Sequence, residues 1–233
     1  MGFGIKRENI PKPLKMLAEQ SHRWAGVVAG PPGTGKTTFL KAIIKVLRIY
    51  KVPTIVVSVK ERFAESEHII IREDIVAKRW SSIMHFTVEG VRPAFDAVSA
   101  YKPRTLDDVE NILTSKFKMD IAEWGLHRTR VLKQWLIVDG NRYLKVPLYL
   151  RDYDELERRL VVGLLYAARA EIDGVLIFDD AMAFVLNLPY REAALAMLRP
   201  YYFAVNRHLL THEILMHNPF TMTPSEPGVC AAA

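Results

Sequence analysis

Residues 30–37 read Gly-Pro-Pro-Gly-Thr-Gly-Lys-Thr, and this short stretch restricts the possible folds of the chain more than any other feature. It fits the pattern G-x-x-x-x-G-K-[ST] of the phosphate-binding P-loop, in which glycines let successive backbone N–H groups turn toward a phosphate. An apolar run at 24–29 precedes the motif and a helical pattern from Thr38 to Tyr50 follows it. This strand–loop–helix context predicts a nucleoside triphosphate site.

The chemistry of the motif assigns a role to each part of the loop. We expect Lys36 to contact the β- and γ-phosphates and the Thr37 hydroxyl to bind Mg²⁺. A helix that begins at Lys36 would also point its unpaired N–H groups and the positive end of its dipole at the anion. The residues expected to bind ATP are Gly30, Pro31, Pro32, Gly33, Thr34, Gly35, Lys36, Thr37 and Thr38.

The composition is that of an ordinary globular protein, with half of the 233 residues apolar and a quarter charged. This length suits one α/β domain, and we expect an N-terminal arm at 1–22, an ATPase domain at 23–220 and a tail at 221–233. A single cysteine and the lack of a long apolar run favour a cytoplasmic protein with no membrane span. The net charge of +6 is compatible with a polyanionic partner and equally with a charge that only maintains solubility.

Hydrophobic patterning predicts strands that alternate with helices. Apolar or β-branched runs predict strands at 54–59, 69–71, 83–88, 135–138, 174–178 and 214–216. Helices are expected at 38–50, from a capping box at Thr105 and Asp108 through Leu113, from Asp152 and Glu155 to Ala170, and at 190–198. Such alternation predicts a mainly parallel sheet with helices on both faces, and residues 60–133 form a variable insertion region within it.

Two carboxylates follow the apolar strand that ends at Phe178. A P-loop site needs one carboxylate near the threonine for the metal, and a hydrolase needs another to polarise the attacking water. We therefore assign Asp179 to Mg²⁺ and Asp180 to the water, with a helix cap after a buried strand as the alternative. Asp139, which ends another predicted strand, is interpreted as a turn residue.

Basic residues with two interspersed aromatic rings are concentrated between 116 and 133. We regard this stretch as the best candidate for a nucleic-acid-facing loop region, although Asp120 and Glu123 within it also fit a mixed solvated surface. The basic residues are Lys116, Lys118, His127, Arg128, Arg130 and Lys133.

From about residue 24 to 220 the order of these elements resembles the HerA/FtsK branch of the additional-strand, RecA-like P-loop ATPases. Phe178-Asp179-Asp180-Ala181 is similar to the hydrophobic-Asp-Glu-Ala motif of that branch, with Asp180 in place of Glu. Residues 207–219 resemble its arginine before a sensor strand, and His217-Asn218 stands where Thr-Gln is usual. The resemblance implies a RecA-like fold and catalytic roles for Lys36, Asp180, Asn218 and Arg207.

The resemblance also implies a partner and an assembly. It is to minimal forms of the branch, such as viral genome-packaging ATPases and plasmid-borne DNA pumps. It therefore implies an Mg²⁺-dependent ATPase that moves double-stranded DNA, forms a hexameric ring and contacts capsid or other assembly proteins. In that ring Arg207 would reach the γ-phosphate of the neighbouring subunit.

Other classes of P-loop protein remain open. An AAA+ replication loader or initiator is the second choice, since Asn218 fits its sensor position. A small-molecule kinase would need an arginine-rich lid, which we do not find, and an ATP-gated assembly factor stays possible because Asp180 replaces the usual Glu. A GTPase is disfavoured because no Asn-Lys-x-Asp motif occurs.

Overall fold

The computed structural model describes residues 7–19, 27–30, 33–63, 67–87, 92–168, 175–180 and 202–206. The statements below concern these residues. Two predicted elements, the helix at 190–198 and the strand at 214–216, lie outside them. None of the described helices is long and apolar enough to cross a membrane.

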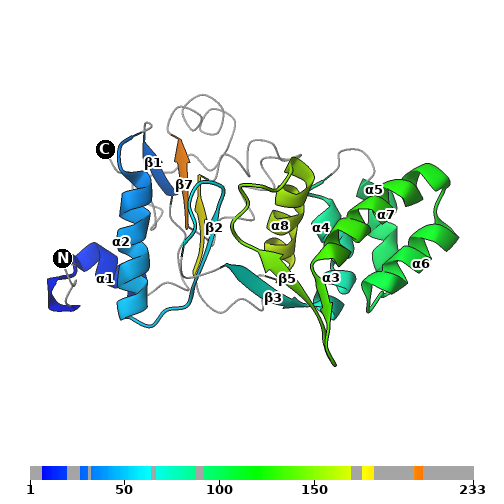
Figure 1. The fold of residues 1–233 in the computed structure, drawn as a ribbon, viewed down its shortest axis with the longest axis horizontal. Helices are drawn as coiled ribbons and strands as arrows, with labels where there is room; N and C mark the ends of the chain where they lie inside the picture. Colours follow the sequence, from blue (N-terminus) through cyan, green and yellow to red (C-terminus); the bar gives the residue numbers. More distant parts are fainter. Residues whose placement is uncertain are drawn as a thin grey trace.

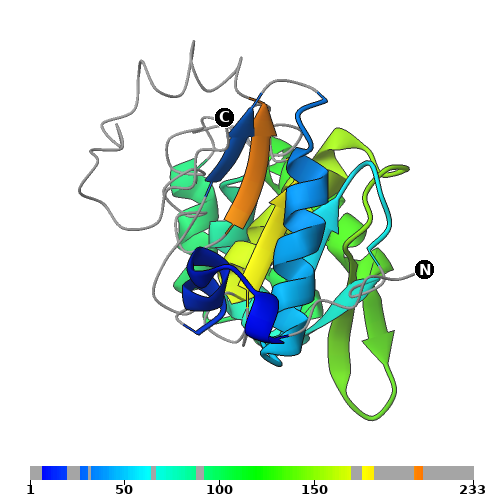
Figure 2. The same ribbon diagram turned by 90° about the vertical axis from the view of Figure 1, so that its left-hand side faces the viewer.

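A four-stranded parallel sheet contains the strand that leads into the P-loop motif (Figures 1 and 2). Every neighbouring pair in it is parallel, and the strand order is β1-β7-β6-β2. The strands are β1 (Val27–Gly30), β7 (Tyr202–Asn206), β6 (Val175–Asp179) and β2 (Thr54–Ser58). The sequence patterns predicted β2 and β6 closely, but they did not identify β7.

Helices cover both faces of this sheet, as predicted. The side chains of β6 alternate: Val175 and Ile177 belong to the cluster with α2 (Lys36–Ile49), whereas Leu176 and Phe178 belong to the cluster with α8 (Glu155–Ala168). Burial on both faces explains why β6 is apolar along its whole length before Asp179. Figure 1 shows α2 and α8 on opposite sides of the strands.

The described part of the N-terminal region packs against α2. A 3-10 helix at Arg7–Asn9 leads into α1 (Lys12–Glu19), which packs on α2. Figure 2 shows the N-terminal helices beside α2. Ile10 and Ala18 are buried in the same cluster as the apolar face of α2. On α2 that face consists of Leu40, Ile43, Ile44, Val46 and Leu47.

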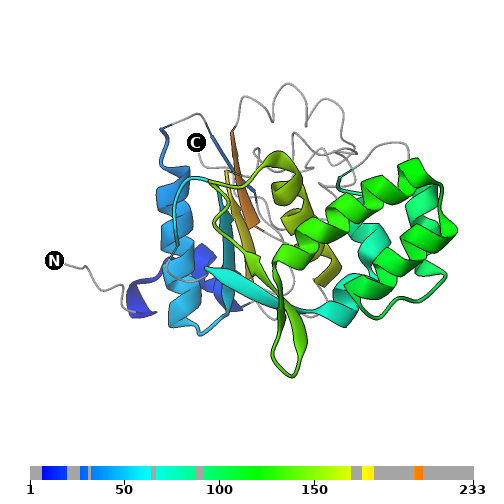
Figure 3. The same ribbon diagram turned by 45° about the vertical axis from the view of Figure 1, so that its right-hand side comes forward.

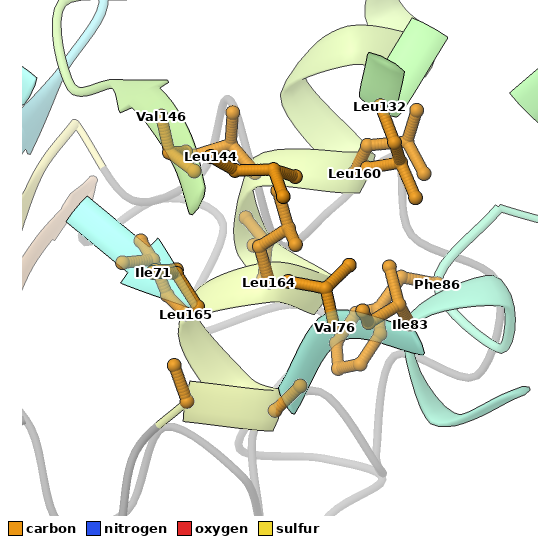
Figure 4. Close-up of a cluster of buried hydrophobic side chains, with 14 of the residues drawn as sticks. Ile71, Val76, Ile83, Phe86, Leu132, Leu144, Val146, Leu160, Leu164 and Leu165 are labelled. Carbon is orange, nitrogen blue, oxygen red and sulfur yellow. The ribbon is translucent and has the colours of Figure 1, made fainter. Parts of the chain in front are cut away.

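The segment between β2 and β6 is an insertion that contains its own small sheet (Figure 3). The elements of this insertion before α8 are β3 (His68–Arg72), α3 (Glu73–Lys78), α4 (Trp80–Met84), α5 (Arg92–Ser99), α6 (Leu106–Lys116), α7 (Met119–Gln134), β4 (Leu136–Val138) and β5 (Arg142–Pro147). The strands pair antiparallel in the order β3-β5-β4. Their apolar side chains and those of the surrounding helices share one core with α8 (Figure 4).

This arrangement corrects two predictions of strands. The run at 135–138 does form a strand, but it belongs to the antiparallel sheet, because only residues 139–141 separate β4 from β5 and a parallel crossover needs a dozen residues or more. The described part of the predicted strand at 83–88, residues 83–87, is not a strand: Ile83 and Met84 end helix α4, and residues 85–87 form a turn. Trp80, Ile83 and Met84 recur at helical spacing and are fully buried, so tertiary packing outweighs strand propensity.

The two predicted caps have different outcomes. Thr105 and Asp108 form a reciprocal capping box at the start of α6, each side chain accepting the other residue's backbone N–H. At α8 the cap lies two residues later than predicted, at Asp154 and Glu157, whose two reciprocal bonds measure 2.8 Å each. The same carboxylate spacing occurs twice there, so spacing alone could not separate the two registers.

Candidate functional site

The P-loop lies between the end of β1 at Gly30 and the start of α2 at Lys36. Gly33 and Gly35 have φ angles of +80° and +83°, a region that favours glycine and that turns the backbone back on itself before the helix. Gly35 is the residue that precedes α2, so the first N–H groups of the helix lie directly after the loop. Pro31 and Pro32 lie outside the described residues.

The structure brings the predicted metal residues together. The Thr37 hydroxyl donates to Asp179 Oδ1 over 3.1 Å, which joins the first turn of α2 to the carboxyl end of β6 across a separation of 142 residues. Asp179 is only 2% exposed. Burial raises the pKa of its carboxyl above the ordinary value, although hydrogen bonds from Thr37 and Ser58 act in the opposite direction.

Ser58 completes this contact and was not singled out from the sequence. Its hydroxyl donates to Asp179 Oδ2 over 3.3 Å, and it accepts the backbone N–H groups of Lys60 and Glu61 over 3.2 Å each. Ser58 is the last residue of β2 and pairs in register with Asp179, the last residue of β6. A polar residue at the end of an otherwise apolar strand was the available signal in the sequence.

Asp180 has a different partner from Asp179. It follows β6 with a φ of +58°, and its Oδ2 lies 2.8 Å from Lys60 Nζ. The hydrogen bond to Asp180 raises the pKa of Lys60, against the effect of desolvation. The two adjacent carboxylates therefore point to different partners. Asp179 contacts the Thr37 hydroxyl, and Asp180 contacts Lys60, which follows β2.

The strand beside the P-loop strand ends in a polar residue. Asn206 is the last residue of β7 and lies in register with Gly30, between the P-loop strand and the strand of Asp179. The sequence placed the sensor residue at Asn218, after a predicted strand at 214–216, and did not single out β7 or Asn206. Asn218 lies outside the described residues, as does Arg207, which directly follows β7 in the chain.

The predicted nucleic-acid-facing segment is helical rather than a loop, and its basic residues divide into two groups. Lys133 lies 2.6 Å from carboxylate oxygens of both Asp107 and Glu110, and Arg128 is 7% exposed. Lys133 is therefore ion-paired within the protein, and Arg128 is too deeply buried to form part of an exposed basic surface. The remaining four are at least partly exposed on α6, α7 and their connection: Lys116, Lys118, His127 and Arg130.

Comparison with known proteins agrees with this geometry. The model of the ATPase family associated with various cellular activities (AAA) matches residues 27–123, less than half of the chain. The match supports membership of the P-loop ATPase superfamily, and with it ATP binding and hydrolysis. AAA ATPases typically use Mg²⁺ and commonly assemble as rings. No curated protein sequence matches the chain.

Proposed function

We propose that this chain is an Mg²⁺-dependent ATPase that moves or packages double-stranded DNA as a ring. The observation that carries the ATPase assignment is the contact between Thr37 and the buried Asp179, because it links the P-loop to the acidic strand. The strand order supports the RecA-like, additional-strand class, since β7 lies between the P-loop strand and the strand that ends at Asp179.

The residues present fit a nucleotide with its metal. Lys36 and the backbone N–H groups at the start of α2 would bind the β- and γ-phosphates. Thr37 and Asp179, now hydrogen-bonded to each other, would hold Mg²⁺, directly or through water. The ion would supply positive charge between the phosphates. Asp180 would orient the attacking water, which requires its carboxylate to leave Lys60.

Two further roles rest on residues at or beyond the end of β7. Asn206, whose backbone lies in register with Gly30, would sense the γ-phosphate. Arg207 would reach the phosphate of the neighbouring subunit, where an arginine can contribute about 10³–10⁵ in rate. In mixed rings, inactive Arg207→Ala and Lys36→Ala chains should together recover part of the activity.

The DNA assignment is supported by the exposed basic residues of α6 and α7. Lysine and arginine side chains that bind phosphates release counterions, so binding should weaken steeply with salt and be tolerant of sequence. Lys116 and Lys118 flank the short connection between the two helices, where both side chains are exposed. Replacing both with glutamine should reduce the salt slope of DNA binding by about 2.

The decisive experiment measures ATP turnover with and without duplex DNA, and the displacement of a third strand from a DNA triplex. Wild type should hydrolyse ATP faster with DNA and displace the third strand only with ATP. Lys36→Ala should lose ATP binding, whereas Asp180→Asn should bind ATP and lose turnover. Turnover that ignores DNA, together with no triplex displacement, would reject the motor assignment.

The second candidate is an AAA+ loader or initiator, which the match at 27–123 favours. Such a protein would bind DNA and hydrolyse ATP without sustained movement along the duplex. The triplex assay separates the two, because DNA-stimulated turnover without strand displacement is the loader's result.

A further inference from the structure

A cleft of about 620 Å³ opens between α7 and the start of α8, among residues that the proposed ATPase mechanism does not use. Its lining includes two arginines, Arg128 and Arg159, and the indole of Trp124. A volume of this size lies within the range of small-molecule sites.

The guanidinium of Arg128 is buried against this cleft without a counter-charge. Arg128 is 7% exposed, and the hydrogen bonds that it donates go to neutral oxygens: Nε to Thr87 Oγ1 over 2.9 Å and Nη1 to the Trp124 carbonyl over 3.1 Å. Within the described part of the chain no carboxylate lies within ion-pair distance of it. An unpaired buried charge is costly, so Arg128 itself carries a positive charge that no ion pair among the described residues neutralises.

Arg159 has a hydrogen-bond donor without a partner among the described residues. Its terminal nitrogen pairs with Glu155, but its Nε is buried and has no hydrogen-bond partner among the described residues. Burial, and then the nearby charge of Arg159, lower the pKa of Arg128. The two guanidiniums thus face one cleft and repel each other, and an anion between them would relieve both deficits.

Trp124 provides a flat apolar surface beside this charge. The guanidinium carbon of Arg128 lies 4.4 Å from the centroid of the indole, yet Trp124 remains 51% exposed. A large aromatic side chain that is half exposed at a cleft commonly stacks on a planar ligand.

Three carboxylates that also line the cleft restrict the charge of the ligand. Glu155 is paired with Arg159, and Asp154 caps α8 by accepting the N–H of Glu157. Glu123 is exposed at the edge. A continuous polyanion such as a DNA strand would meet these acidic groups, whereas one compact phosphate could reach the arginines between them.

We propose that this cleft binds a small molecule with one phosphate group and a planar ring, of the size of a nucleoside monophosphate. The phosphate contacts Arg128 and Arg159, and the ring stacks on Trp124. This site is separate from the P-loop, so occupancy of the cleft does not require ATP hydrolysis.

The test uses the Lys36→Ala chain, in which the P-loop no longer competes for nucleotide, and titrates it with AMP by calorimetry and tryptophan fluorescence. AMP should bind saturably at one site per chain. Arg159→Gln in this background should weaken binding at least tenfold, and Arg128→Gln should do the same. Arg130→Gln is the matched control, because Arg130 is exposed on the same helix and does not line the cleft.

Further measurements control for loss of the fold and for the part of the ligand that is recognised. Thermal unfolding identifies a variant that has lost its fold, and Arg159→Gln, which alters a partly exposed side chain, then decides alone. Inorganic phosphate should bind more weakly than AMP but with the same dependence on Arg159, and adenosine should bind poorly. No saturable binding of AMP, equal binding by the Arg159→Gln and Arg130→Gln chains, or binding of adenosine as tight as that of AMP would overturn the proposal.

Discussion

Replacing Ser58 with alanine tests whether Asp179 is the metal carboxylate and whether its orientation matters. The Ser58 hydroxyl is the only described side-chain donor to Asp179 Oδ2, whereas Oδ1 accepts from Thr37. Once Thr37 turns toward Mg²⁺, Ser58 would be the remaining donor that holds the carboxylate in place. The substitution removes this donor and leaves the charge of the site unchanged.

The expected magnitude follows from the geometry of that bond. A hydrogen bond to a charged group contributes about 1.5–3 kcal/mol, and the 3.3 Å separation places this one near the lower limit. About 1.4 kcal/mol corresponds to a factor of ten, which agrees with the loss of about 10–100-fold seen when a residue that orients a metal ligand is removed. We expect Mg²⁺ to bind the Ser58→Ala–ATP complex about tenfold more weakly.

The assay measures the Kd of a fluorescent ATP analogue across a series of Mg²⁺ concentrations. Its pH dependence adds a second readout. The pKa of Asp179 is already raised by burial, so protons should compete with Mg²⁺ at a higher pH than at an exposed aspartate. Losing the Ser58 bond, which favours the charged form, should move the pH profile of Ser58→Ala further upward.

Ser115→Ala is the matched control, because that hydroxyl is exposed and bonds only to a backbone carbonyl of its own helix, that of Asn111. It should leave the Mg²⁺ dependence and the pH profile unchanged. If folded Ser58→Ala bound Mg²⁺–ATP as tightly as wild type and with the same pH profile, Asp179 would not be the metal carboxylate that we propose.

Three further outcomes are expected. Lys60→Gln should raise basal ATP turnover up to about fivefold at unchanged ATP affinity, because it frees Asp180 from an exposed ion pair worth at most about 1 kcal/mol. Unchanged or lower turnover would show that the ion pair does not restrain Asp180. Arg142→Met should lower the free energy of unfolding in urea by about 3 kcal/mol, because it leaves the buried Glu73, which is 1% exposed, without its cation. A decrease of less than about 1 kcal/mol would contradict this account of the ion pair. Gly163→Ala should lower the free energy of unfolding by about 1–2 kcal/mol, because the Cβ of the new alanine would lie 2.9 Å from a backbone carbonyl oxygen of α4. A variant more stable than wild type would refute this prediction.

Features with a local cause were predictable from the sequence. The P-loop needs particular residue types at fixed positions, and the strand before it and the helix after it extend the same local pattern. The capping box of α6 likewise depends on two residues three positions apart. The sequence singled out Asp179 because it follows an apolar strand and a P-loop site needs a carboxylate near its threonine, and the structure brings it into contact with Thr37.

Features that depend on distant partners were not predictable in the same way. The bond from Ser58 to Asp179 joins residues 121 positions apart, and the strand order decides which residues stand opposite each other. Local pattern identifies a strand but not its neighbours, so the 135–138 strand was assigned to the wrong sheet. Only the short turn at 139–141 could have corrected this, because it predicts a hairpin.

The end of β2 connects the nucleotide site to the insertion. Both backbone groups of Ser58 bond to the segment between β5 and α8: its N–H donates to Leu148 O over 3.0 Å, and its C=O accepts from Leu150 N over 2.8 Å. The Leu150 carbonyl in turn accepts from Arg158 of α8 over 3.1 Å. A movement of Asp179 on binding Mg²⁺–ATP must therefore break its bond to Ser58 or displace this segment together with the start of α8. Since α8 shares its core with the helices that carry the exposed basic residues, a continuous packed path connects the proposed metal carboxylate to the proposed DNA-binding residues.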